Sequence, residues 1–201
     1  MNEWEINRVS IYRNNYTRRY LKKVIQVLEL SADDLVNKVD RVVSILIKAR
    51  DNNKTIFIMG NGGSAMTASH FVSDLSKGTI VEGAKRFRVI GLVDNVANIL
   101  AWANDISYEE IFVEQLKNLM NSGDVVIGIS GSGESMNVIK AIEYANEQDG
   151  VTIGLCGFDG GKLSQIAKES IIVTCDNMQR IEDTHLIIEH LLTSLIKAEQ
   201  E

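Results

Sequence analysis

The stretch Gly60-Asn61-Gly62-Gly63-Ser64 decides the fold of this chain, because it follows directly on the largely apolar run 55–59. A short apolar run that ends in glycine predicts a buried strand, and the residues that follow suit a loop and the start of a helix. Such a strand–loop–helix unit aims backbone N–H groups at one point. The stretch therefore predicts a site for an anion.

A second stretch of the same kind, Ser130-Gly131-Ser132-Gly133-Glu134-Ser135, follows the apolar run 125–129 about seventy residues later. The alternative interpretation is that both loops are only tight turns with helix caps. Two loops at the carboxyl ends of strands favour a bound phosphorylated small molecule, because ligands of open α/β sheets bind there. The hydroxyls that we expect on the phosphate are those of Ser64, Ser130, Ser132 and Ser135.

Neither loop has the pattern of a nucleotide-binding protein. The Gly-Lys-Ser/Thr of a P-loop is missing from both loops, and Ala65 occupies the position of the last glycine of a dinucleotide fingerprint. The sequence therefore favours a small phosphorylated ligand over a nucleotide.

The composition excludes several classes of protein. The chain has 201 residues and is 45% hydrophobic, which predicts a single domain over residues 1–201. A net charge of −6 argues against nucleic-acid binding. No apolar run approaches the ~18 residues of a membrane span, and no signal peptide begins the chain, so we expect no membrane and a cytoplasmic location. Both cysteines are expected to be reduced.

Apolar runs alternate with helical patterns along most of the chain. The predicted strands are 55–59, 88–93, 125–130, 151–156 and 171–175. The predicted helices are 5–29, a second one from an N-cap at Ser31 to about residue 50, 64–77, 95–103, 108–121, 135–148, 161–168 and 179–199. This order predicts an α/β fold with a parallel sheet covered by helices on both faces. The apolar surface of the last helix is wide enough to suggest a second subunit.

All three histidines lie on the two helices that we expect to line the pocket. His70 and Asp74 are four positions apart and share one helix face, which is also a common arrangement on an ordinary surface helix. The last helix carries Glu182, His185, Glu189 and His190. Since His185 and His190 are five positions apart, at most one of them is expected to be catalytic.

The motifs occur in a characteristic order. They are Gly60-Asn61-Gly62-Gly63-Ser64, His70-Phe71, Asn104-Asp105, Ser130-x-Ser132-Gly133-x-Ser135-x-Asn137, Asp159-Gly160-Gly161-Lys162 and Arg180-Ile181. Over nearly the whole chain, this order resembles the sugar isomerase (SIS) domain proteins of the phosphoheptose isomerase family. The resemblance implies a three-layer sandwich with a five-stranded parallel sheet and a helical N-terminal segment, residues 1–50, that contributes to oligomer packing. It also implies a homotetramer with active sites at subunit interfaces.

The resemblance assigns roles to individual residues. It implies isomerisation of sedoheptulose 7-phosphate to D-glycero-D-manno-heptose 7-phosphate through an enediolate, which needs a base and an acid. We assign Asp74 as the base and His190 as the acid. Some family members bind zinc, and the implied metal ligands are His70, Asp74, Glu182 and His190. The implied substrate-binding residues are Asn61, Gly62, Gly63, Ser64, Asn104, Asp105, Ser130, Ser132, Ser135 and Glu182.

Four residues depart from the family pattern. Asp74 replaces the usual Glu, Glu182 the usual Gln, Gly131 a Thr and Gln179 an acidic residue. Two acids beside two histidines make a better site for a divalent cation. One alternative is therefore an isomerase for another ketose phosphate, such as an arabinose 5-phosphate or a hexulose phosphate. Another is a non-catalytic SIS tetramer that binds a replication-initiator-type protein, although such a protein has no reason to keep Asp74 and His190 together.

Overall fold

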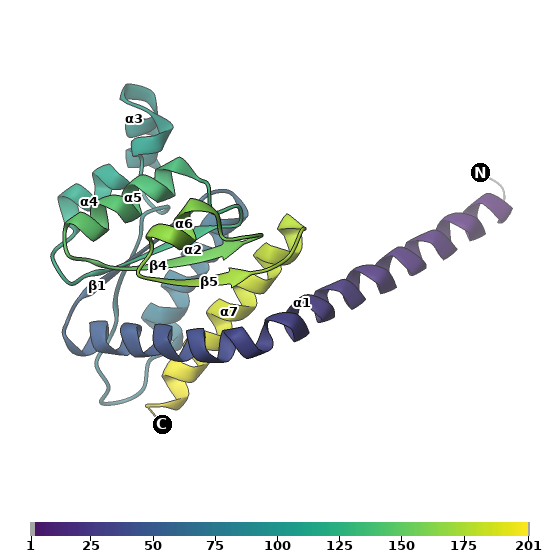
Figure 1. Cartoon of the computed structure of the whole chain (residues 1–201), viewed down its shortest axis with the longest axis horizontal. Coiled ribbons are helices and arrows are strands. Elements are labelled where there is room, and N and C mark those ends of the chain that lie inside the picture. The colour runs from purple at the N-terminus through teal and green to yellow at the C-terminus, as the bar shows by residue number, and fades with distance from the viewer. Residues whose placement is uncertain (1–2, 201) are drawn as a thin grey trace.

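Helices surround a central parallel sheet in the computed structural model, which describes residues 3–200 and the side chains of residues 10–200 (Figure 1). The helices are α1 Glu3–Asp51, α2 Gly63–Ser73, α3 Val96–Asp105, α4 Val113–Leu119, α5 Met136–Glu147, α6 Gly161–Ile166 and α7 Met178–Ala198. The strands are β1 Thr55–Gly60, β2 Arg88–Gly91, β3 Val125–Ser130, β4 Val151–Gly157 and β5 Glu169–Val173. Among the described residues, none of the helices has the length and hydrophobicity to span a lipid bilayer.

The five strands lie in the order β2-β1-β3-β4-β5, and every neighbouring pair is parallel. The predicted parallel sheet is therefore confirmed. After β1 the chain crosses to one edge of the sheet, and β3 then pairs on the other side of β1. The loops after β1 and β3 consequently leave neighbouring strands at the same edge, at the switch point where open α/β sheets bind ligands.

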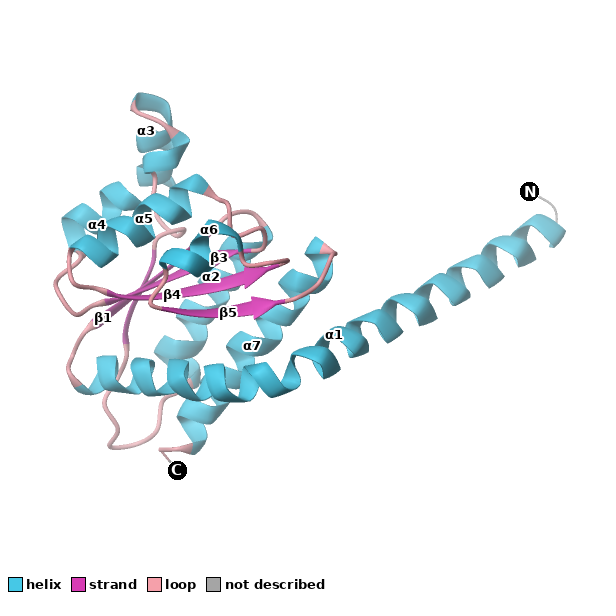
Figure 2. Cartoon of the chain, in the orientation of Figure 1, coloured by secondary structure: helices cyan, strands magenta, loops and turns pink. Residues whose placement is uncertain are grey.

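Alternate residues of each strand point to opposite faces of the sheet, and each face has its own core. Ile56 and Ile58 of β1 pack in a core with residues of α1, α2 and α7. Phe57 and Met59 pack in a second core with residues of α4, α5 and α6. The result is the expected three-layer sandwich (Figure 2).

Residues 3–51 form one continuous helix, so the predicted break at Ser31 is wrong. The Ser31 hydroxyl donates to the carbonyl of Val27 at 2.7 Å, four residues back, and therefore belongs to a helix interior. The C-terminal half of α1 packs on the body, where Arg41 bonds Glu169 of β5 at 2.8 and 3.0 Å. The N-terminal half projects from the body as a long arm (Figure 1).

Two other predicted helices differ in their details. The segment expected as 108–121 is a 3₁₀ turn, Tyr108–Glu110, followed by α4. The segment expected as 64–77 is α2 followed by a π-helical turn, Asp74–Gly78, in which the Thr79 amide donates to the Asp74 carbonyl at 3.1 Å. Such wider turns are frequent at functional sites, and this one begins at a residue that we expect to be catalytic.

Candidate functional site

The first Gly/Ser loop joins β1 to α2 through a close approach of the backbone. A Cβ atom on Gly60 would lie 2.6 Å from the carbonyl oxygen of Ser64, so only glycine fits there. Asn61 and Asn137 exchange two amide hydrogen bonds of 2.9 Å, and the Tyr108 hydroxyl donates to Asn61 Oδ1 at 2.8 Å. Because Asn137 belongs to α5, this network ties the first loop to the helix that follows the second.

The second loop, between β3 and α5, brings two serine hydroxyls together. Ser130 Oγ lies 3.0 Å from Ser135 Oγ and also accepts from the Gly133 amide at 3.1 Å. The Ser132 hydroxyl accepts from the Glu134 amide at 3.2 Å. Ser135 precedes α5 but its side chain does not cap the helix, whereas the Asn137 side chain accepts from the Val138 amide at 2.9 Å.

The other predicted substrate-binding residues occupy different surroundings. Gly62 and Gly63 are exposed, whereas Ser64 is buried at the start of α2. Asn104 and Asp105 are exposed at the end of α3, where the Asn104 amide donates to Asp105 Oδ1 at 2.8 Å. Among the side chains of residues 10–200, hydrogen bonds do not connect this pair to either loop.

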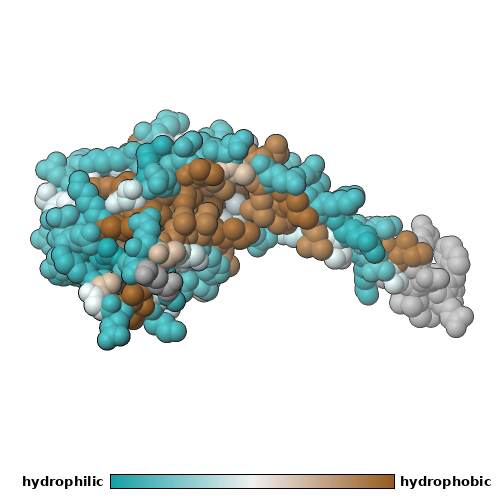
Figure 3. Space-filling model, turned by 90° about the horizontal axis from the view of Figure 1, so that it is seen from below, coloured by the Kyte–Doolittle hydropathy of each residue, from teal (hydrophilic) through white to brown (hydrophobic). Residues whose placement is uncertain are grey.

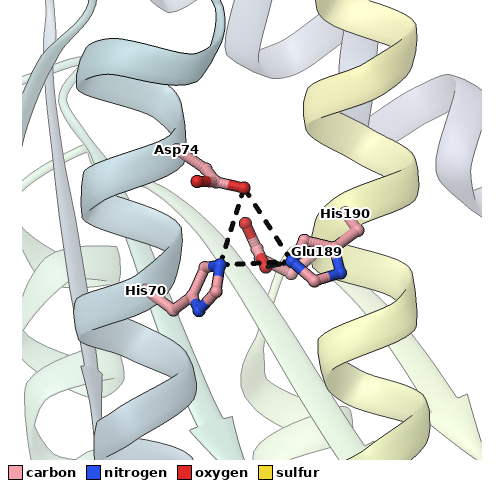
Figure 4. A group of neighbouring side chains, drawn as sticks. All are labelled: His70, Asp74, Glu189 and His190. Atoms are coloured by element: carbon pink, nitrogen blue, oxygen red, sulfur yellow. Dashed lines mark hydrogen bonds and ion pairs between the residues drawn. The ribbon is translucent and has the colours of Figure 1, made fainter.

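Four side chains from two helices converge on one point (Figure 4). His70 belongs to α2, Asp74 begins the π-helical turn, and Glu189 and His190 belong to α7. One ligand atom of each residue lies within 4.8 Å of the others. The two Nε2 atoms of the histidines are 3.1 Å apart, and Asp74 Oδ2 is 3.7 Å from the first and 4.0 Å from the second.

Glu189 is the most unusual member of this cluster. Its side chain is fully buried, and among residues 10–200 neither carboxylate oxygen has a hydrogen-bond partner. Oε2 lies 3.5 Å from Nε2 of His190. Burial, and then the neighbouring Asp74 carboxylate, raise the pKa of Glu189 to about 8. A buried carboxylate without partners is costly, so the cluster is suited to a ligand that supplies positive charge.

The cluster has the donor set of a divalent metal site. It offers two imidazole nitrogens and two carboxylate oxygens within 4.8 Å of one another. Imidazole suits zinc and iron, and carboxylate also suits manganese and magnesium. The orphaned oxygens of Glu189 supply an independent reason for a cation at this point. The residues therefore fit a divalent cation.

Glu182, which was expected as a metal ligand, is not a member of this cluster. Its carboxylate lies against Gly63, where an added Cβ atom would be 2.6 Å from Oε1. Eight residues of helix separate Glu182 from His190, which corresponds to about 12 Å along the axis. Because α7 runs beside α2, Glu182 reaches the N-terminus of α2 and the residues near His190 reach its C-terminal turns.

The sequence analysis did not predict that Glu189 belongs to the cluster, although its position among apolar residues of α7 indicates it. Glu189 lies four residues after His185 and falls on the buried stripe of α7, between Ile188 and Leu192. A carboxylate on an apolar stripe needs a partner. His185 itself is fully buried, with Nε2 2.9 Å from the carbonyl oxygen of Cys156. His185 therefore belongs to the core, and of the two α7 histidines only His190 joins the cluster.

Known proteins share the fold and more than a third of the aligned sequence. The SIS domain family model matches residues 19–157, so this is a SIS-domain protein. Phosphoheptose isomerases of Geotalea daltonii and Helicobacter pylori are 39% and 38% identical to it, over 86% of this chain and 89% of each relative. The solved structure of a phosphoheptose isomerase from Francisella tularensis has a TM-score of 0.87 at 27% identity, and the match covers 92% of this chain and 98% of that chain. The chain belongs to the phosphoheptose isomerase family.

Proposed function

We propose that the protein is an aldose–ketose isomerase that converts sedoheptulose 7-phosphate to D-glycero-D-manno-heptose 7-phosphate. The observation that carries the proposal is the convergence of His70, Asp74 and His190 from α2, its π-helical turn and α7. The similarity to proteins named phosphoheptose isomerase, over 86% of the chain, supports the choice of substrate.

The phosphate group binds at the second Gly/Ser loop in this proposal. The hydroxyls of Ser130 and Ser135 face each other at 3.0 Å, and the Ser135 side chain does not cap α5. Hydroxyls and helix N-terminal amides together hold a phosphate well, because the helix dipole favours negative charge there. Ser64 and Ser132, with the Asn61-Gly62-Gly63 turn, Asn104, Asp105 and Glu182, are proposed to contact the rest of the sugar.

Proton transfer is assigned to Asp74 and His190. Asp74 takes the proton from the carbon beside the carbonyl, and His190 moves a proton between the two oxygens. Both side chains are partly accessible, with exposed fractions of 31% and 49%, so a sugar can reach them from solvent. His70 donates to the developing enediolate or holds a cation.

A divalent cation, with zinc as the first choice, is proposed for the cluster. The residues that would hold it are His70, His190 and the carboxylates beside them. When bound, such an ion polarises the carbonyl and stabilises negative charge on oxygen.

We also propose a cytoplasmic homotetramer built from single SIS domains that span residues 1–201. Figure 3 shows brown, apolar side chains gathered in the middle of one face of the molecule. A groove between α1 and α7 is lined by apolar residues, among them Leu28, Leu35, Val36, Leu191 and Leu195. Exposed apolar patches of this kind mark protein–protein contacts, so the helical segment 1–50 and α7 are the surfaces assigned to subunit packing.

The proposal is tested by incubating the protein with sedoheptulose 7-phosphate in D2O, with and without zinc. We expect deuterium in an aldose product, and we expect Asp74→Asn and His190→Ala to abolish both exchange and product. Glu147→Gln, an exposed acid at the end of α5, is the matched control. Exchange with arabinose 5-phosphate or a hexulose 6-phosphate, and none with the heptulose, would assign another sugar phosphate as the substrate. No exchange with any of them would overturn the proposal.

A further inference from the structure

The cluster contains two carboxylates that differ in their access to solvent. We propose that Glu189, rather than Asp74, is the carboxylate that anchors the cation, and that Asp74 is left facing the sugar as the base. This inference rests on the proposed function, because it divides two tasks of that site between two residues. The division gives Glu189 a role that the sequence motifs do not assign.

Burial places Glu189 on the protein side of the cluster. Its side chain has an exposed fraction of 0%, so a sugar that enters from solvent does not contact it. In the described part of the chain neither of its oxygens accepts a hydrogen bond, and Asp74 lies close enough to share a proton with it. Its Oε2 is 3.5 Å from Nε2 of His190, and that nitrogen is 3.1 Å from Nε2 of His70. A cation between the two imidazoles would satisfy the buried carboxylate.

Asp74 has the opposite surroundings. Its side chain is 31% exposed, and it stands where α2 widens into the π-helical turn. Its Oδ2 lies 3.7 Å from His70 and 4.0 Å from His190, somewhat farther than Glu189 lies from its own neighbour. A bound divalent cation stabilises the ionised form of a carboxylate and so weakens it as a base. A carboxylate that does not anchor the cation keeps its capacity to accept a proton.

The two helices contribute equally to this arrangement. α2 and its π-helical turn supply His70 and Asp74, and α7 supplies Glu189 and His190.

The competing explanation is that Glu189 shares a proton with Asp74 and holds no cation at all. The two explanations differ in what the removal of one negative charge does to cation affinity.

The test measures Zn²⁺ affinity of the metal-stripped full chain by competition with a chromogenic chelator. We expect Glu189→Gln to weaken Zn²⁺ binding by at least about tenfold, the loss typical of a disturbed metal shell. Asp74→Asn is expected to weaken it by less than about threefold, the effect of a nearby charge that is partly solvated. Asp183→Asn, an exposed acid of the same helix outside the cluster, is the matched control and should leave the affinity unchanged.

The absorption spectrum of bound Co²⁺ distinguishes a residue that coordinates the ion from a residue that only lies near it. Co²⁺ bound in place of Zn²⁺ has absorption bands that depend on its ligands, so Glu189→Gln should shift them and Asp183→Asn should not. Glu189→Asp keeps the charge and should recover part of the lost affinity. Circular dichroism and thermal unfolding of the metal-free variants show whether each one is folded.

Several outcomes would overturn the inference: a larger loss of affinity in Asp74→Asn than in Glu189→Gln, an unchanged Co²⁺ spectrum in Glu189→Gln, or no Zn²⁺ binding by the unaltered protein. Loss of binding in both His70→Ala and His190→Ala places the ion in the cluster. The outcome of the deuterium-exchange assay is independent of this one. If the protein isomerises the sugar but its Zn²⁺ affinity does not change in Glu189→Gln, only the inference about Glu189 is overturned. A chain that binds Zn²⁺ through Glu189 but exchanges no sugar proton would sink the proposed function.

Discussion

The two Gly/Ser loops follow neighbouring parallel strands, yet the acids around them are placed in opposite ways. At the first loop, the carboxylate of Glu182 from α7 lies against Gly63, the first residue of α2. At the second loop, Glu134 is turned away from α5, because its carboxylate accepts from the Lys162 amide at 2.7 Å at the start of α6. A carboxylate at a helix N-terminus competes with any other anion for the same amides.

The comparison shows that similar loop sequences do not make equal anion sites. Both loops turn the chain from a strand into a helix, but a residue more than a hundred positions away decides whether an acid of the chain lies at the first one. In the second loop two serine hydroxyls lie 3.0 Å apart, and Ser135 does not cap α5.

The largest expected effect is on stability. Gly133 of the second loop has φ 70°, and a Cβ atom there would overlap the carbonyl oxygen of Gly160. We expect Gly133→Ala to lower the free energy of unfolding by about 3 kcal/mol or more, since strain and overlap with backbone act together. Gly62 of the first loop has φ 54° but open space around its Cβ position, so Gly62→Ala should cost only about 1 kcal/mol. Urea denaturation measures both, and equal losses would contradict the comparison.

The next largest effect is expected on substrate affinity, which serine substitutions in the two loops should change by different amounts. Ser130→Ala and Ser135→Ala are each expected to weaken sedoheptulose 7-phosphate binding about 10- to 100-fold, as for hydrogen bonds to a charged group. Ser64→Ala in the first loop should weaken it by less than about threefold, because the nearby Glu182 carboxylate disfavours a phosphate there. Calorimetry measures the affinities, and inorganic phosphate as a competitor reports on the phosphate subsite. A larger effect of Ser64→Ala would exchange the roles of the two loops.

The contact between Glu182 and Gly63 should appear as a coupling free energy. Gly63→Ala brings a methyl group to within 2.6 Å of Glu182 Oε1, so the side chain must move. We expect Gly63→Ala to destabilise the protein by about 1 kcal/mol, and to cost much less when Glu182 is already alanine. The four proteins of this double-mutant cycle are compared by urea denaturation. Additive effects would show that the carboxylate does not lie against the loop.

The smallest effect on stability is expected for an ion pair far from both loops, and it serves as a reference for the effects at the loops. The hydrogen bonds from Arg41 lower the pKa of Glu169, so the native protein holds this proton less tightly than the unfolded chain does. The stabilisation is therefore present above about pH 4.5, the ordinary value, and is lost as the pH falls through the lower native pKa. Because Arg41 is half exposed, we expect Glu169→Gln to cost only about 0.5 kcal/mol at pH 7. A difference between the two proteins that stays constant down to pH 3 would exclude this cause.

The sheet was predictable from the sequence because each strand is a short apolar run followed by glycine or polar residues. The continuity of α1 was not predictable, since Ser31 and the two acids after it suit a helix cap and a helix interior equally well. The partners of His70 and Asp74 were predictable in part. His190 joins them as expected, but Glu189 replaces Glu182, because the rotation and offset of α7 against α2 depend on tertiary packing.

His70 and His190 are 120 positions apart in the chain, and α7 follows every other helix and strand. During synthesis the ribosome releases all five strands and both loops before it releases Glu189 and His190. The same helix brings Ile188 and Leu192 into the core below the cluster. The addition of α7 therefore closes that core and assembles the cluster together, and a chain that stops before α7 keeps the loop sequences without the cluster.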